Sequence, residues 1–152
     1  MIAPASAAQL TSLSGREASI FACVTDTVVA PEPQLPPVIE TDAVAFFDRW
    51  MGRSPRINRV GLRGLLYVLE LAPLAQGFGA RLRRLDTAER ARFLSEIDGS
   101  PLPLLRQLAK LVKGFALLSY YGDDRVMLRV GYDAEANLTR ARDLRVREGR
   151  PG

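Results

Sequence analysis

Apolar residues recur at helical spacing along most of this 152-residue chain, and no useful length of it alternates apolar and polar positions as a strand does. The pattern predicts helices over residues 15–29, 41–52, 54–71, 86–97, 101–121 and 123–130, with a last helix from about residue 135 to 147. We therefore predict an all-α fold: a single-domain, irregular bundle of about six to seven helices.

The segment 101–121 is the most apolar of these and is predicted to be the buried central helix of the bundle. Its i, i+4, i+7 spacing puts all three of its charges on one narrow stripe: Arg106, Lys110 and Lys113. Ser100 is a candidate cap, Pro101 suits the first helical position, and Gly122 can end the helix. The same charges interrupt the apolar run, which argues against a transmembrane segment.

Capping residues and prolines mark the other boundaries. Ser14 with Glu17, and Asp86 with Glu89, have the form of capping boxes that open helices. Four prolines within residues 30–40 prevent a helix there, so we expect an extended, proline-rich strap. Residues 1–13 are expected to be a flexible start, residues 14–147 a single helical domain, and residues 148–152 a tail.

Composition narrows the possible chemistry. Histidine is absent, which removes the usual general base and the commonest metal ligand. Cys23 is the single cysteine, so an intrachain disulfide and a thiolate metal cluster are both excluded, and its apolar neighbours favour a place in the core. The first residues lack the basic and apolar regions of a signal peptide and contain no twin-arginine leader, and we therefore expect a cytoplasmic protein.

Charge is unevenly distributed along the chain. Residues 1–50 contain two basic and six acidic side chains, whereas residues 51–152 contain nineteen basic and eleven acidic ones, a net charge of +8. Such asymmetry suits nucleic acid, an anionic surface or an acidic protein partner. The arginine-rich C-terminal stretch has interspersed acids and no interleaved aromatic residues, which favours a solvated helix face or a protein interface over phosphate binding.

Two groups of residues are candidate sites of chemistry, and a structural interpretation fits each of them better. The glycines at 77 and 79 begin a dinucleotide-binding pattern, but Leu82 stands where its third glycine belongs and no strand precedes it. The tyrosines and aspartates within residues 120–133 could act as acid and base or hold a hard cation. Asp123 and Asp124 begin a predicted helix, however, where carboxylates cap backbone amides. We predict no catalytic, cofactor-binding or metal site on this chain.

The central segment and the residues after it resemble a known family, the small helical subunit 3 of membrane-bound gluconate 2-dehydrogenases. They are also similar to the helical N-terminal region of long-chain fatty alcohol oxidases. The resemblance spans roughly residues 13–142 and is clearest at these positions: Leu104-Leu105-Arg106-Gln107-Leu108, Lys110, Lys113, Leu117-Leu118, Tyr120-Tyr121-Gly122-Asp123, Val126 and Gly131-Tyr132-Asp133.

The resemblance implies a non-catalytic accessory subunit. Its partner would be a large FAD-dependent flavoprotein of the glucose-methanol-choline type, which oxidises an alcohol or sugar hydroxyl and which the small subunit would stabilise or help to mature. No cofactor is expected on this chain, and FAD is expected on the partner. The residues predicted to contact that partner lie in the strap, around the end of the central helix and in the last helix: Pro33, Leu35, Pro36, Tyr120, Tyr121, Tyr132, Arg140, Arg142 and Arg145.

Two alternatives remain open from the sequence. The first is a basic helical module that binds nucleic acid or an anionic surface, supported by the charge of residues 51–152. The second is a small enzyme that uses the polar group within residues 120–133.

Overall fold

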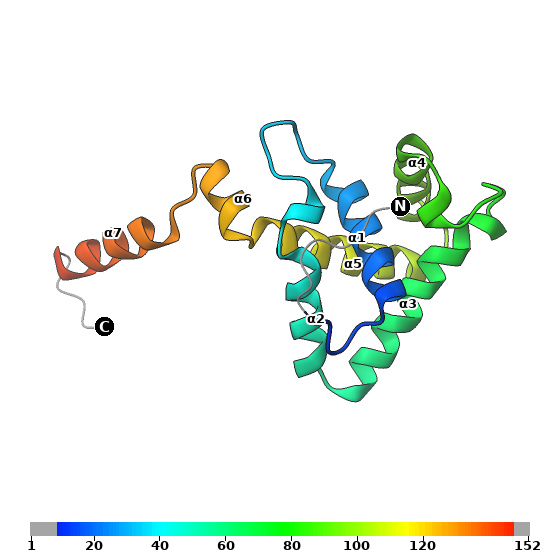
Figure 1. Ribbon diagram of the computed structural model, residues 1–152, viewed down its shortest axis with the longest axis horizontal. Coiled ribbons are helices and arrows are strands. Elements are labelled where there is room, and N and C mark those ends of the chain that lie inside the picture. The colour runs from blue at the N-terminus through cyan, green and yellow to red at the C-terminus, as the bar shows by residue number, and fades with distance from the viewer. Residues whose placement is uncertain (1–8, 148–152) are drawn as a thin grey trace.

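The computed structural model describes residues 9–147 and confirms the all-α bundle, since this range contains seven α-helices and no strand (Figure 1). Two short 3-10 helices, η1 (Val38–Glu40) and η2 (Leu82–Arg84), lie in the connections. The α-helices are α1 (Gly15–Val29), α2 (Ala43–Arg53), α3 (Arg56–Ala75), α4 (Thr87–Asp98), α5 (Pro103–Tyr121), α6 (Asp124–Arg129) and α7 (Ala134–Arg147).

Helix α1 is the most enclosed helix of the bundle. It packs against α2, α3, α4 and α5, and no residue from Glu17 to Val29 is fully exposed. Helix α5 packs against α1, α2, α4 and α6, so it is central as expected, but one of its faces stays open to solvent. The prediction that residues 101–121 are buried around most of the helix was therefore wrong for that face.

An aromatic cluster joins the three helices that meet at the centre of the bundle. Phe21 of α1 stacks on Phe47 of α2 with ring centroids 4.0 Å apart. Phe115 of α5 meets the edge of Phe47 at 5.5 Å and lies 4.4 Å from the Trp50 ring. Such pairs add to the apolar area that they bury. The same main core continues into α3 and α4 through Leu66 and its buried neighbours.

Both predicted capping boxes are present. The Ser14 hydroxyl accepts from the Glu17 amide while the Glu17 carboxylate accepts from the Ser14 amide, and Asp86 and Glu89 do the same at the start of α4. Helix α5 begins later than predicted, with Leu102 as its N-cap and Pro103 in its first turn. The reason is steric: a residue that precedes proline is disfavoured in helical conformation, so Leu102 stays extended and Pro101 cannot start the helix.

Helix α3 runs past the predicted end at residue 71. Pro73 is accommodated inside its last turn, and the amides of Gln76 and Phe78 both donate to the Pro73 carbonyl. The chain turns at Gly77 and Gly79, whose φ angles of 84° and 76° are readily adopted only by glycine. The glycine pair is thus a helix junction, as the sequence favoured.

The described part of the N-terminal segment is held in place, unlike the flexible start that was predicted. Three consecutive amides, those of Thr11, Ser12 and Leu13, donate to the carboxylate of Asp48 on α2 at 2.7–3.0 Å. The hydroxyl of Thr11 adds a fourth hydrogen bond. Residues 1–8 and the predicted tail at 148–152 lie outside the described range.

The proline-rich strap is folded into turns rather than extended. The Leu35 amide donates to the Glu32 carbonyl at 2.8 Å, which closes a turn, and η1 follows it. The prolines restrict φ and remove donors, but φ near −65° also suits turns and 3-10 helices. The strap forms a loop that returns to the α5–α6 end of the body (Figure 1).

Helix α7 extends away from the packed body (Figure 1), and apart from the half-buried Asn137 its described side chains are exposed. The packed part of the chain therefore ends at α6.

Candidate functional site

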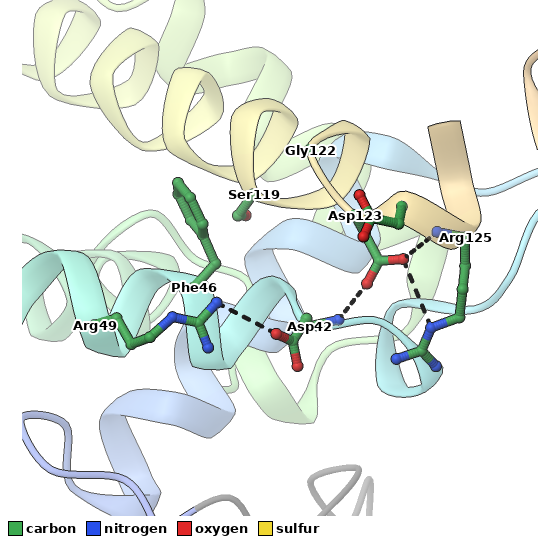
Figure 2. Close-up of a pocket in the computed structure, with 8 residues that line it drawn as sticks. Asp42, Phe46, Arg49, Ser119, Gly122, Asp123 and Arg125 are labelled. Atoms are coloured by element: carbon green, nitrogen blue, oxygen red, sulfur yellow. Dashed lines mark hydrogen bonds and ion pairs between the residues drawn. The ribbon is translucent and has the colours of Figure 1, made fainter. Parts of the chain in front are cut away.

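A buried carboxylate, that of Asp123, lies at the junction between α5, α6 and the start of α2, close to the predicted partner-contact residues at the end of α5. Asp123 lies in the turn between α5 and α6, and its side chain is only 3% exposed. Its carboxylate caps α6 by accepting from the Arg125 amide at 2.9 Å, and it also accepts from the Asp42 amide at the start of α2 at 2.7 Å (Figure 2). One carboxylate thus satisfies the first turns of two helices.

Arginines surround this junction and are themselves paired. Arg125 lies 3.7 Å from the Asp123 carboxylate and donates to the Glu40 carbonyl on the strap side. Arg49 of α2 forms an exposed ion pair with Asp42 at 3.3 Å (Figure 2). These contacts tie the strap, α2 and α6 together at one point.

A pocket of about 250 Å³ opens beside the junction. It is lined by Asp42, Phe46, Arg49, Ser119, Gly122, Asp123, Asp124 and Arg125 (Figure 2). The carboxylates of Asp42 and Asp123 already serve the arginines and helix amides around them, and Ser119 donates to the Ala116 carbonyl. These contacts support the capping interpretation of Asp123 over acid–base chemistry, and no group of three potential metal-ligating side chains occurs in the described part of the chain.

Tyr120 was predicted to contact a partner, and the structure corrects this because its side chain is fully buried. Its hydroxyl donates to the Pro36 carbonyl at 2.6 Å, and its ring meets Tyr121 edge to face at 5.1 Å. Burial raises the pKa of Tyr120, and the neighbouring Tyr121, Asp123 and Asp26 raise it further. Tyr120 therefore anchors the strap to α5 from inside a small second core with Val38 and Val126.

The other predicted contact residues are divided among separate elements. In the strap, Pro33 is exposed while Leu35 and Pro36 are half-buried. Tyr121 and Tyr132 are 41% and 50% exposed. Arg140 and Arg142 are exposed on the projecting α7, and the side chain of Arg145 lies outside the described part of the structure. The strap and Tyr121 lie near the same end of α5. The arginines belong to α7, which extends away from this end (Figure 1).

An exposed apolar surface, which was not predicted from the sequence, runs along α5. Leu104, Leu111 and Leu118 recur every seven residues and are all exposed, with Gln107 and Gly114 between them and Tyr121 one turn beyond Leu118 on the same side. Leu117 and the exposed Lys110 border them. We call this set, Leu104, Gln107, Leu111, Gly114, Leu117, Leu118 and Tyr121, the α5 face. Seven-residue spacing of leucines is the pattern by which one helix packs against another.

Cys23 lies in the main core, as its neighbours suggested. Burial raises the pKa of its thiol to about 11, against a smaller opposite effect from Arg90. The thiolate form is therefore scarce near neutral pH, which suits a packing role.

Among the described residues, no helix is both long and apolar enough to cross a bilayer. Comparisons with protein-family models, with curated proteins and with solved structures find no match to this chain.

Proposed function

We propose that this chain is a non-catalytic accessory subunit that binds and stabilises, or helps to mature, an FAD-dependent alcohol or sugar dehydrogenase or oxidase of the glucose-methanol-choline type. FAD and the chemistry would belong to the partner. The proposal starts from the resemblance of the stretch 104–133 to the small subunit of gluconate 2-dehydrogenases, and the α5 face is the observation that carries it furthest.

The α5 face supports a docking role because it presents apolar surface where a self-contained domain would present polar residues. Leu111 and Leu118 lie at its centre and are about half exposed, and Tyr121 closes its C-terminal end. Contiguous exposed apolar patches on small proteins commonly mark interaction sites, and aromatic residues are frequent anchors. The buried Tyr120 and Asp123 hold the end of this face in shape by fixing the strap, α2 and α6 to it.

Co-expression with flavoproteins of this type from the same genome tests the proposal. The expected result is a complex that co-elutes in size-exclusion chromatography and a partner with higher FAD content and turnover than when it is made alone. Leu111→Glu should abolish both effects, because a charge would be buried in the interface. Leu71→Glu on α3 is a matched control, since the two leucines are exposed to the same degree, 46% and 44%. A partner that folds, binds FAD and turns over equally well without this chain would overturn the proposal.

The basic binding module remains a second candidate, favoured by the exposed arginines on the projecting α7. Titration of a mixed-sequence DNA duplex against the chain at several salt concentrations distinguishes the two. DNA binding should weaken steeply as salt rises, and it should also weaken in the double variant Arg140→Glu and Arg142→Glu. Docking of a flavoprotein on the α5 face should tolerate added salt and the double variant.

A further inference from the structure

A second apolar helix face lies on α3, away from every residue used above for the flavoprotein interface. Five large side chains on this helix are 44% to 77% exposed: Ile57, Val60, Val68, Leu71 and Leu74. The positions 57, 61, 64, 68 and 71 follow each other at spacings of three and four, so they form one continuous stripe along the 20-residue helix. We call these positions, with Val60 and Leu74 on their border, the α3 face. The opposite side of α3, including Leu62 and Leu66, packs into the core.

Two glycines lie in the middle of the α3 face, and the monomer gives no reason for them. Glycine inside a helix costs about 1 kcal/mol relative to alanine. A Cβ added at Gly61 or at Gly64 would meet no atom within 4 Å, so neither glycine makes room for any other residue of the described range 9–147. Glycine on a helix surface does allow a second backbone to approach closely, because interaxial distance depends on the side chains at the contact.

Basic side chains follow one edge of the α3 face. Arg56, Arg59 and Arg63 recur at i, i+3 and i+7; Arg56 and Arg63 are exposed and lie one turn to either side of Val60, while Arg59 is half-buried on the next row round the helix. Arg63 is paired with Glu17 at 3.5 Å, but Arg56 and Arg59 have no ion-pair partner among residues 9–147. The edge therefore presents positive charge beside the apolar α3 face.

These observations together select one kind of occupant. The glycines favour a helix over a lipid surface, because close approach of a second backbone stabilises helix packing and has no counterpart in binding to a bilayer. The arginines disfavour a second copy of α3, which would bring like charges to the same edge. We propose that the α3 face binds an amphipathic helix of another protein whose apolar seam is bordered by acidic residues. This surface is separate from the α5 face, so either proposal can fail without the other.

Synthetic helical peptides of about 20 residues, matched in length to α3, test the proposal. All carry the same leucine and alanine seam, and their edge positions are Glu in one peptide and Lys in another. Fluorescence anisotropy should show the Glu peptide binding at least about tenfold more tightly than the Lys peptide. The double change Arg56→Glu and Arg59→Glu should reverse that preference.

Gly61→Leu tests directly whether the glycines of the α3 face are needed for binding. The side chain has open space in the monomer, so the fold should persist by circular dichroism, while binding of the Glu peptide should weaken by about tenfold or more. Gly15→Leu at the start of α1 is the matched control, since its Cβ also meets nothing within 4 Å, and it should leave binding unchanged, while Gly114→Leu tests whether the peptide binds the α5 face instead. Loss of binding by Gly114→Leu but not by Gly61→Leu would overturn the assignment to α3.

Two further outcomes would also refute the inference. One is equal affinity for the Glu and Lys peptides. The other is evidence that the α3 face binds something else. Such evidence would be binding to phosphatidylglycerol vesicles, or dimerisation in sedimentation experiments, that is lost in Gly61→Leu or Ile57→Glu.

Discussion

Replacing Asp48 tests how the N-terminal segment is attached to the bundle. Its buried carboxylate accepts four hydrogen bonds from Thr11, Ser12 and Leu13, three of them from backbone amides. In Asp48→Asn, an NH₂ group that can only donate replaces one carboxylate oxygen. It would face the N–H and O–H donors of residues 11–13, so it would have no acceptor there. Hydrogen bonds to a charged acceptor contribute about 1.5–3 kcal/mol each, and an unsatisfied buried donor costs about 1–3 kcal/mol. We expect Asp48→Asn to lower the free energy of unfolding by about 2–4 kcal/mol.

The pH dependence of this effect has a definite sign. Burial disfavours the charged carboxylate, but the hydrogen bonds from Thr11, Leu13 and Ser12 outweigh burial and hold the pKa of Asp48 below its ordinary value. A carboxylate whose pKa is lower in the folded chain stabilises the fold above the ordinary pKa of about 4. That contribution is lost as the pH falls through the folded-state pKa, so the difference between wild type and Asp48→Asn should shrink towards acid.

Urea unfolding followed by circular dichroism at pH 7 and at several lower pH values measures both effects. Asp143→Asn is a suitable control because Asp143 is exposed on α7, and it should change stability by less than about 0.5 kcal/mol. Equal stability of Asp48→Asn and wild type at pH 7, or a difference that grows in acid, would refute the reasoning.

Three smaller predictions follow from other contacts. Tyr120→Phe removes the hydrogen bond to the Pro36 carbonyl and should cost about 1–2 kcal/mol; faster hydrogen exchange at the hydrogen-bonded amides of Leu35, Glu40 and Thr41 would show that the strap has loosened, and unchanged exchange and stability would contradict the anchor. Cys23, buried and with a pKa of about 11, should react with a thiol reagent at pH 8 only as fast as the chain unfolds, and rapid labelling of the native protein would show that the thiol is accessible. Gly64→Ala should raise the free energy of unfolding by about 0.5–1 kcal/mol, because its Cβ meets open space; a destabilised variant would mean that the glycine is needed within the monomer.

Local patterns predicted the helices well because their causes are local. Capping boxes, the glycine stop at 122 and the apolar stripes of α1 and α4 all act within a few residues. The late start of α5 also has a local cause, since a second proline at 103 moves the start of α5 beyond Pro101.

Features that depend on distant residues were not readable from the sequence. Asp48 binds residues more than thirty positions away, and nothing in its neighbourhood distinguishes it from a surface aspartate. Whether an apolar helix face is covered depends on how many helices surround it, so the sequence could not show that α5 has an open face and that α1 is enclosed. Tyr120 could have been assigned to the core, because it lies four residues after the small, buried Ala116 on the same side of the helix.

The enclosure of α1 affects how the chain can fold. Its packing partners extend as far as α5, so the helix that is made first contacts the helix that ends at Tyr121. Helical bundles in which neighbours in sequence pack together usually fold fast, and contacts between distant segments slow folding. We expect this protein to fold more slowly than an up-and-down bundle of its size. During synthesis the apolar sides of α1 would remain uncovered until most of the chain has left the ribosome.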